Sequence, residues 1–497
     1  MQNPETYTTA CRCAALTHRR PRLWSFPRTE PPTSMTTARS DAFVFFGATG
    51  DLAYRKIFPA LQALVRSGDL KMPVIGMARE GWSLEQLRER ARDSLEKNGG
   101  VDPAAFARLC EQLRYVGGDY NDPATYQRLR QALGDATHPL HYLAIPPSMF
   151  GQVAQGLANA GCTEGARIVV EKPFGRDLAS ARELNRTVHE VFAEPTIFRI
   201  DHYLGKEAVQ NLQHLRFANT FLDPIWNHHS VQSVQITMAE KSGVEGRGGF
   251  YEEVGALRDV VQNHLLQVTA LLAMDAPAGR EPDAVRAEKL RLFRAMRPLD
   301  PANVVRGQFQ GYRDEPGVAS DSQVETFVAL CLHIDTWRWA DVPFHIRTGK
   351  RLPVTATEVL VNLKRPPLAV FDNFSPEESD YYRFRLSPEV VIAIGARVKQ
   401  HGEAMQGERV ELVARHEPRS PMLEYERLLR DALEGDPGLF TRDDCVEAAW
   451  RVIDPVLVLA TPVHEYEPGT WGPAAAAAVV AGDTGWHNPG SEQSPPC

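Results

Sequence analysis

The 497-residue chain contains no apolar run close to the roughly 20 residues that a membrane-spanning helix needs. It also has little cysteine. Its seven thiols are scattered, and Cys11 and Cys13 are too close together and too isolated to form a metal site. Scattered thiols are typical of a reducing compartment. The net charge of −8 argues against a nucleic-acid partner. We therefore expect a cytoplasmic protein that binds neither membrane nor nucleic acid.

The composition that remains is ordinary for a globular enzyme, with 43% hydrophobic and 24% charged residues. A chain of this length exceeds one compact core, so we expect two domains, at residues 41–198 and 199–490. Two interpretations stay open for residues 1–40, which are rich in Arg, Pro and Thr: a disordered segment, or an extension ahead of a true start at Met35. We expect residues 491–497 to be a disordered tail.

Residues 42–46 form a continuous apolar run, as is typical of a central parallel strand. The turn GATGDLA follows at residues 47–53, and then a helix with Ile57, Leu61 and Leu64 on one face. Strand, glycine turn and helix are the first unit of a dinucleotide-binding fold, in which a pyrophosphate lies at the helix N-terminus. The candidate cofactor-binding residues of this turn are Gly47, Thr49, Gly50, Asp51 and Leu52.

The second predicted strand, residues 72–78, ends directly before Arg79. An acidic residue at this place selects NAD, whereas an arginine suits the 2′-phosphate of NADP. Arg79 therefore favours NADP, and the neighbouring Glu80 leaves secondary use of NAD open.

Two further strands are predicted to deliver residues to the ligand crevice at the carboxyl end of this sheet. Residues 141–145 precede two prolines, and residues 167–170 precede Lys172. Tyr142 and Lys172 complete the candidate cofactor-binding set.

Strand-like segments with few helices between them dominate the rest of the chain, which predicts a large, mostly antiparallel sheet. These segments are residues 231–238, 325–335, 344–347, 357–363, 389–398 and 410–413. Helices are predicted at residues 249–274, 283–296 and 442–451. The fold class is thus a Rossmann-like α/β domain followed by a larger α+β domain.

The most informative stretch is residues 199–207, which read RIDHYLGKE. A buried strand is predicted to end at Ile200, and a helix to begin near His202, so that Lys206 shares its face. Free backbone N–H groups at such a corner, with an ammonium, an imidazole and a phenol, suit a phosphate. The alternative is a solvated helix start with a chance charge cluster.

This run resembles the signature of the glucose-6-phosphate dehydrogenase family, with every position intact. The turn GATGDLA and the sequence EKPFG at residues 171–175 resemble the same family, and the similarity spans about residues 42 to 489. The resemblance implies NADP-dependent oxidation of glucose 6-phosphate to 6-phosphogluconolactone, the first step of the oxidative pentose phosphate pathway. It also implies a homo-oligomer, dimer or tetramer, formed through the large sheet.

His264 falls on the apolar stripe of the helix predicted over residues 251–273. A histidine on such a face is more often a core residue, but Arg258, Asp259 and Asn263 make this stripe unusually polar. The segment RDVVQNHLLQ resembles the family segment that carries the general base. The resemblance implies His264 as that base and Asp201 as the carboxylate that fixes its tautomer.

The resemblance also implies how the substrate is held. The phosphate is assigned to His202, Tyr203, Lys206 and Lys350, the sugar hydroxyls to Glu240 and Asp259, and the reacting end to Lys172. We expect no metal, and dismiss His228 and His229 as ligands because adjacent side chains in a strand face opposite ways.

Two positions depart from the family pattern: Thr355 stands where an arginine is frequent, and Glu252 where an aspartate is common. Arg351 is a candidate replacement for the missing arginine. Two rival functions follow, a sugar-phosphate dehydrogenase with altered cofactor or substrate choice, and a non-catalytic NADP-binding paralogue.

Overall fold

The computed structural model describes residues 38–79, 81–368, 370–371, 379–402, 405–416, 422–457, 461–483 and 485–490. The expectations for residues 1–37, for Glu80 and for residues 491–497 lie outside the described residues. Among helices in the described ranges, none combines the length and apolarity needed to cross a membrane.

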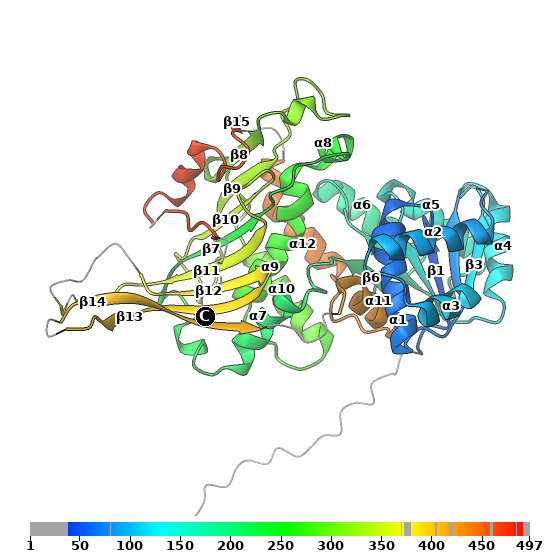
Figure 1. The fold of residues 1–497 in the computed structure, drawn as a ribbon, viewed down its shortest axis with the longest axis horizontal. Helices are drawn as coiled ribbons and strands as arrows, with labels where there is room; N and C mark the ends of the chain where they lie inside the picture. Colours follow the sequence, from blue (N-terminus) through cyan, green and yellow to red (C-terminus); the bar gives the residue numbers. More distant parts are fainter. Residues whose placement is uncertain are drawn as a thin grey trace, which may run out of the picture. The chain divides into compact units, whose positions relative to one another are not determined.

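A parallel six-stranded sheet forms the N-terminal part of the fold, in the order β3-β2-β1-β4-β5-β6 (Figure 1). Its strands are β1 (Ala42–Phe46), β2 (Val74–Ala78), β3 (Leu113–Gly117), β4 (Pro139–Leu143), β5 (Arg167–Glu171) and β6 (Ile197–Ile200). The order reverses between β1 and β4, and ligands bind at the carboxyl ends of strands beside such a switch point. The predicted Rossmann-like sheet is confirmed.

Helices cover both faces of this sheet because the residues of β1 alternate between two cores. Phe43 and Phe45 pack with α1 (Phe58–Ser67), α2 (Leu84–Lys97) and α3 (Pro103–Gln112). Val44 and Phe46 pack with α4 (Pro123–Leu133), α5 (Phe150–Asn159) and α6 (Leu178–His189). Side chains on a strand point alternately to opposite faces, so a strand buried on both faces is apolar throughout.

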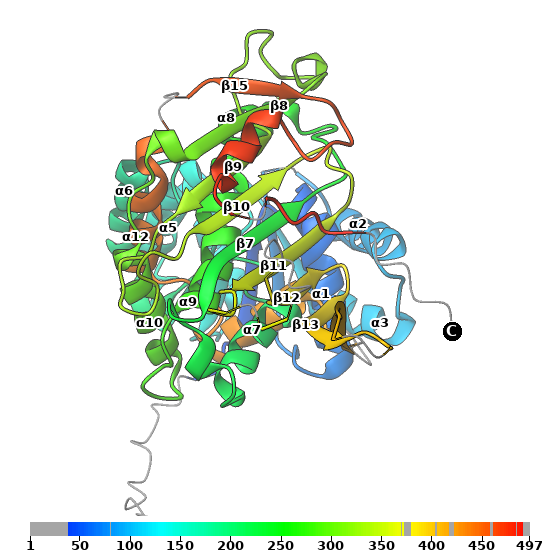
Figure 2. The ribbon, with the colours of Figure 1, turned by 90° about the vertical axis from the view of Figure 1, so that its left-hand side faces the viewer.

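The second sheet has nine strands in the order β14-β13-β12-β11-β7-β10-β9-β8-β15, and Figure 2 shows many of them side by side. The strands are β7 (Val231–Ala239), β8 (Val304–Phe309), β9 (Phe327–Leu332), β10 (Phe344–Gly349), β11 (Ala356–Leu363), β12 (Tyr381–Ser387), β13 (Val390–Lys399), β14 (Gly407–His416) and β15 (Val463–Tyr466). Among the described strands of this sheet, the parallel pairs are β7–β10 and β8–β15, and the other neighbours are antiparallel. The prediction of a large, mostly antiparallel sheet is confirmed, although it missed β8, β12 and β15.

The helix predicted at residues 249–274 is not continuous, which corrects the sequence analysis. It consists of α8 (Gly248–Ala256), a π-helical segment (Leu257–Leu265) and α9 (Leu266–Ala273). Gly255 breaks the first part with a φ of 63°, a conformation that L side chains rarely adopt. The Leu257 amide then donates to Glu325 Oε1 at 3.1 Å, so a β-sheet loop caps the new helical segment.

The remaining helices are α7 (Glu207–Ala218), α10 (Pro282–Ala295), α11 (Glu424–Glu434) and α12 (Asp443–Ile453). The sequence predicted α7, α10 and α12 but missed α11. Figure 1 shows α11 beside α1, and its residues Leu428, Leu429 and Leu433 join the core that contains Phe198 of β6. A late part of the chain therefore completes the N-terminal core.

Leu428 tests this packing because it is 0% exposed. We expect Leu428→Ala to lower the free energy of unfolding by about 2–5 kcal/mol, as for other buried leucines. Leu423→Ala is the matched control, since that leucine is 45% exposed. Equal shifts of both variants in denaturant titrations would contradict the placement of α11.

Candidate active site

The site begins at the corner between β6 and α7. Asp201 follows the last residue of β6, and α7 starts only at Glu207, with Lys206 as its N-cap. Turn hydrogen bonds occupy the residues between: the Leu204 amide donates to the Asp201 carbonyl at 3.0 Å, and the Lys206 amide to the Tyr203 carbonyl at 3.1 Å. The predicted helix start near His202 is therefore wrong. The turn carries the polar side chains, and the helix begins after them.

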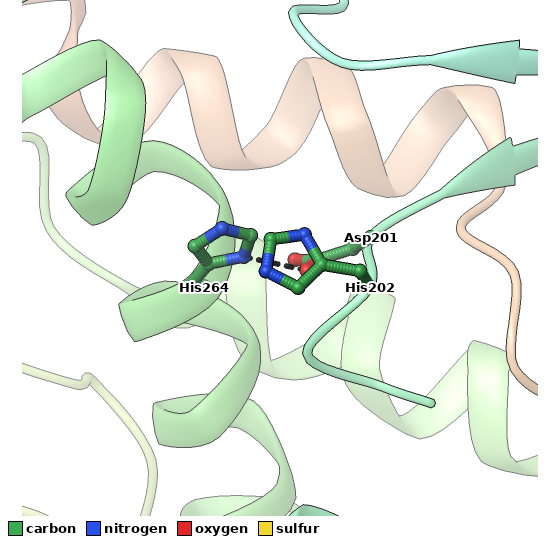
Figure 3. Close-up of side chains that lie close together, drawn as sticks. All are labelled: Asp201, His202 and His264. Atoms are coloured by element: carbon green, nitrogen blue, oxygen red, sulfur yellow. Dashed lines mark hydrogen bonds and ion pairs between the residues drawn. The ribbon is translucent and has the colours of Figure 1, made fainter. Parts of the chain in front are cut away.

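Asp201 and His264 meet although 63 residues separate them in sequence. His264 Nδ1 lies 2.6 Å from Asp201 Oδ1, and both side chains are at most 4% exposed (Figure 3). The carboxylate also accepts the Tyr203 amide at 3.0 Å, which fixes its orientation. Figure 3 shows the His202 ring beside this pair, with its centroid 4.5 Å from that of His264.

The charges around the dyad favour a neutral imidazole beside an ionised carboxylate. Burial lowers the pKa of His264, and the nearby Lys172 ammonium lowers it further, while Asp201 acts in the opposite direction. Burial alone would raise the pKa of Asp201, but attraction and hydrogen bonding to His264 hold it below its ordinary value. The ionised Asp201 accepts the proton of Nδ1, so Nε2 presents its lone pair.

Lys172 caps that lone pair. Its Nζ lies 2.9 Å from His264 Nε2, 2.9 Å from the Asp259 carbonyl oxygen and 3.3 Å from Asp259 Oδ1. The Lys172–Pro173 peptide bond is cis. A hydroxyl that gives its proton to His264 must therefore replace the ammonium at Nε2.

Two ammonium groups approach the corner itself. Lys206 Nζ lies 3.7 Å from the centroid of the Tyr203 ring, and the Tyr203 hydroxyl lies 3.2 Å from Thr357 Oγ1. Burial lowers the pKa of Lys206, Glu424 raises it, and the positive charge of Lys56 lowers it again. Lys56, which the sequence analysis did not single out, bonds Glu424 Oε1 at 2.9 Å. Burial and the neighbouring positive charge make the charged form of Lys206 less stable. A bound anion would restore that stability, so this corner attracts an anion.

Glu240, Asp259 and Lys350 form a second side of the site, beside the corner. Lys350 Nζ lies 2.6 Å from Glu240 Oε1 and 4.0 Å from Asp259 Oδ2. Burial would raise the pKa of Asp259, but the ammonium groups of Lys172 and Lys350 hold it below its ordinary value. Asp259 is therefore an ionised carboxylate shared by two lysines, and it connects this side to His264 through Lys172.

The structure thus brings together all nine residues predicted for catalysis and substrate binding. These are Lys172, Asp201, His202, Tyr203, Lys206, Glu240, Asp259, His264 and Lys350.

The predicted cofactor residues follow β1 and β2, except Tyr142 and Lys172. Gly47 has a φ of +79°, and a Cβ there would lie 2.2 Å from the Ala144 carbonyl oxygen, so only glycine fits. The Gly50 amide donates to the Gly47 carbonyl at 2.9 Å, and this hydrogen bond closes a turn that contains Thr49. Asp51 and Leu52 follow the turn directly. Such a turn at the switch point fits a dinucleotide pyrophosphate.

Arg79 and Tyr142 differ in their availability. Arg79 is exposed at the end of β2, with Nη2 3.5 Å from Met149 Sδ, and it is free to meet a 2′-phosphate. Tyr142 is fully buried in the core, and its hydroxyl donates to Glu171 Oε1. The Tyr142 side chain therefore packs within the core of the parallel sheet, and its contact with a cofactor stays a prediction.

The departures from the family pattern have defined contacts. Thr355 Oγ1 accepts the Lys241 amide at 3.0 Å. Arg351, the candidate replacement for the missing arginine, forms an ion pair with Glu245 at 2.6 Å. Its guanidinium group is therefore already engaged. Glu252 accepts hydrogen bonds from the hydroxyls of Tyr312 and Ser322, at 3.0 and 2.7 Å.

Two sets of described residues lie close enough to share a metal ion: Asp201 with His202 and His264, and His189 with Glu194 and Asp443. In the first set, the hydrogen bond between Asp201 and His264 explains why the residues lie close together. In the second set, a hydrogen bond of 2.9 Å between His189 Nε2 and Glu194 Oε2 explains part of the arrangement. His228 and His229 lie in a turn before β7 with ring centroids 3.8 Å apart, so the argument that they face opposite ways in a strand is wrong.

Two substitutions should move the pKa of His264 in opposite directions. Asp201→Asn should lower it, because the carboxylate stabilises the imidazolium form. Lys172→Met should raise it, because the ammonium at Nε2 opposes a second positive charge. An NMR titration of the imidazole measures both, and shifts of the same sign would refute the electrostatic arrangement.

Comparisons with known proteins cover almost all of the described chain. Residues 44–211 match the family model "Glucose-6-phosphate dehydrogenase, NAD binding domain", and residues 213–487 match "Glucose-6-phosphate dehydrogenase, C-terminal domain". Glucose-6-phosphate 1-dehydrogenase 1 of Mycobacterium tuberculosis is 45% identical over 453 residues, which is 90% of this chain and 97% of the relative. The Aggregatibacter actinomycetemcomitans enzyme is 39% identical over 478 residues, which is 89% of this chain and 96% of the relative.

Solved structures agree with the sequence relatives. The glucose-6-phosphate 1-dehydrogenase of Mycobacterium avium superposes with a TM-score of 0.86 at 44% identity, covering 92% of this chain and 100% of that chain. A glucose-6-phosphate dehydrogenase in complex with its substrate glucose-6-phosphate gives 0.84 at 35% identity, covering 91% of this chain and 100% of that chain. The chain therefore belongs to the glucose-6-phosphate dehydrogenase family.

Proposed function

We propose that the protein oxidises glucose 6-phosphate to 6-phosphogluconolactone with NADP, the first step of the oxidative pentose phosphate pathway. The observation that carries this proposal is the buried Asp201–His264 dyad, whose Nε2 lone pair lies beside a cluster of lysines. A base next to cationic groups suits a hydroxyl on a phosphorylated substrate. The family membership and the relative solved with glucose-6-phosphate support the same reading.

In the proposed mechanism, the phosphate binds His202, Tyr203 and Lys206, with Lys56 and Lys350 adding positive charge. Glu240 and Asp259 accept hydrogen bonds from sugar hydroxyls, as carboxylates near cationic partners do. This grip brings the C1 hydroxyl to His264.

The C1 hydroxyl then displaces the Lys172 ammonium and donates its hydrogen bond to His264 Nε2. His264 takes the proton while C1 loses a hydride, and Asp201 stabilises the imidazolium that forms. When bound, NADP supplies the hydride acceptor. Gly47, Thr49, Gly50, Asp51 and Leu52 would hold its pyrophosphate, and Arg79 its 2′-phosphate.

Four further properties belong to the proposal. We assign a cofactor domain to residues 41–198 and a substrate domain to residues 199–490, with α11 packed into the cofactor core. We propose a homo-oligomer formed through the nine-stranded sheet and a cytoplasmic location, in keeping with the scattered cysteines. Secondary use of NAD is part of the same proposal.

The direct test is NADPH absorbance with glucose 6-phosphate and with other sugar phosphates, with NADP or NAD. We expect His264→Asn to lower turnover by about 10²-fold or more while binding of glucose 6-phosphate persists, because a general base contributes at least that factor. His214→Asn, on the exposed side of α7, is the matched control.

Silence of the wild-type protein with every pair of substrates would favour a non-catalytic NADP-binding paralogue. Activity with a different sugar phosphate would favour a related dehydrogenase. Loss of binding without loss of turnover in His264→Asn would refute the role of His264.

Arg79 provides a separate test of cofactor choice. Arg79→Ala should raise the KM for NADP about tenfold or more, since a hydrogen bond to a charged group is lost, and should change the KM for NAD much less. Arg66→Ala removes another exposed positive charge, in the last turn of α1, and serves as control. Equal effects on both cofactors would exclude contact between Arg79 and a 2′-phosphate.

A further inference from the structure

A buried carboxylate that the proposed mechanism does not use ends β5, directly before Lys172. Glu171 is 7% exposed, and the hydroxyl of Tyr142 donates to its Oε1. The hydroxyl of Tyr425, on α11, interacts with the same carboxyl group and lowers its pKa. Burial raises the pKa of Glu171 to about 7, although both phenols and Lys172 act to lower it. Two tyrosines from different parts of the chain therefore hold one titratable carboxyl group at the end of a central strand.

Tyr425 also contacts the turn between β6 and α7, through the ring of His202. Its ring lies nearly parallel to that of His202, with centroids 6.3 Å apart and an interplanar angle of 18°. The His202 ring in turn packs edge-on against His264. The hydroxyl of Tyr425 thus reaches the strand end that carries Lys172, while its ring supports a phosphate-binding histidine.

Helix α11 is fixed against the turn between β6 and α7 and against Lys56, so the position of Tyr425 is fixed as well. Arg427 Nη1 donates to the Gly205 carbonyl at 3.0 Å, and Lys56 binds Glu424 at 2.9 Å. A Cβ on Gly205 would lie 2.9 Å from the Glu424 carbonyl oxygen, so the turn and the helix touch backbone to backbone. Tyr425 therefore has little freedom to move away from His202.

We propose that Tyr425 and Glu171 are positioning residues for the reaction at His264: the Tyr425 ring fixes His202, and its hydroxyl, through Glu171, fixes the strand end that carries Lys172. This inference rests on the proposed function and deepens it. The carboxylate is the working form, because it accepts the phenolic hydrogen of Tyr142 and is stabilised by the hydroxyl of Tyr425. A protonated Glu171 carries an O–H that needs an acceptor of its own and holds the phenols less strongly.

Glu171→Gln tests the carboxylate through the pH dependence of kcat/KM. In the wild type we expect an acid limb near the pKa of Glu171, about 7. The glutamine does not titrate, which leaves His264, whose pKa lies below its ordinary 6.5, to set the limb. The limb should therefore move to lower pH in Glu171→Gln. A glutamate with a merely structural role would change the melting temperature and leave the limb in place.

Variants of the two tyrosines distinguish the effect of the Tyr425 hydroxyl from the effect of its ring. Tyr425→Phe and the matched control Tyr142→Phe each remove one hydroxyl that lowers the pKa of Glu171, so both should move the acid limb to higher pH. Tyr425→Leu also removes the ring beside His202, and should raise the KM for glucose 6-phosphate about 2- to 10-fold. Tyr142→Phe lacks that effect, because Tyr142 packs in the core of the parallel sheet.

Unchanged limbs in Glu171→Gln and Tyr425→Phe, together with an unchanged KM in Tyr425→Leu, would overturn the inference. If Glu171→Gln fails to fold, the phenylalanine variants still decide the limb. A wild-type protein that binds glucose 6-phosphate without turning it over would refute the proposed function alone. Calorimetry then decides the inference, which requires weaker glucose 6-phosphate binding in Tyr425→Leu than in Tyr142→Phe, and equal binding refutes it. Absence of binding by the wild type would overturn both proposals.

Discussion

The structure depends on one short hydrogen bond between two buried ionisable groups, Asp201 and His264. Each group alone would be costly to bury, because a charged or polar group without a partner loses its hydration and gains nothing in return. Together they satisfy one another at 2.6 Å. This requirement ties the end of a parallel strand to a helical segment that follows the first strand of the nine-stranded sheet.

Several unusual local features help to hold His264 within hydrogen-bonding distance of Asp201. Gly255 interrupts the helix ahead of His264, and Glu325 recaps it with a carboxylate that is itself held by Arg306 at 3.0 Å. The π-helical segment that follows carries both Asp259 and His264. Contacts with distant residues therefore determine which way the side chains of this segment face, and the preceding helix α8 does not. Around it, lysines create a local positive region in a chain whose net charge is −8.

Local sequence predicted those features that depend on neighbouring residues. The bounds of β1 and the end of β6 were predicted, because apolar runs there end at clear turn signals. The polar corner after β6 was predicted because five functional side chains lie within nine residues. The helix start at His202 was predicted wrongly, since a hydrogen-bonded turn uses the same residue types as a helix N-terminus.

Features that depend on distant partners could not be read in this way. Strand β12 contains Arg383 and Arg385, which appear too polar for an inner strand until Glu358 on β11 neutralises both. The break at Gly255 depends on Glu325, and the placement of Tyr425 depends on the docking of α11. No pattern near residue 425 indicates that it reaches Glu171 and His202, because those contacts join residues more than 200 positions apart.

The late position of α11 in the chain has a consequence during synthesis on the ribosome. Phe198 and Ile200 share a core with Leu428, Leu429 and Leu433, so this apolar surface stays uncovered until the last of these residues emerges. At the usual elongation rate of about 5–20 residues per second, the interval lasts on the order of tens of seconds. Nascent chains of this protein thus expose a hydrophobic face for that time, which makes them natural clients for chaperones at the exit tunnel.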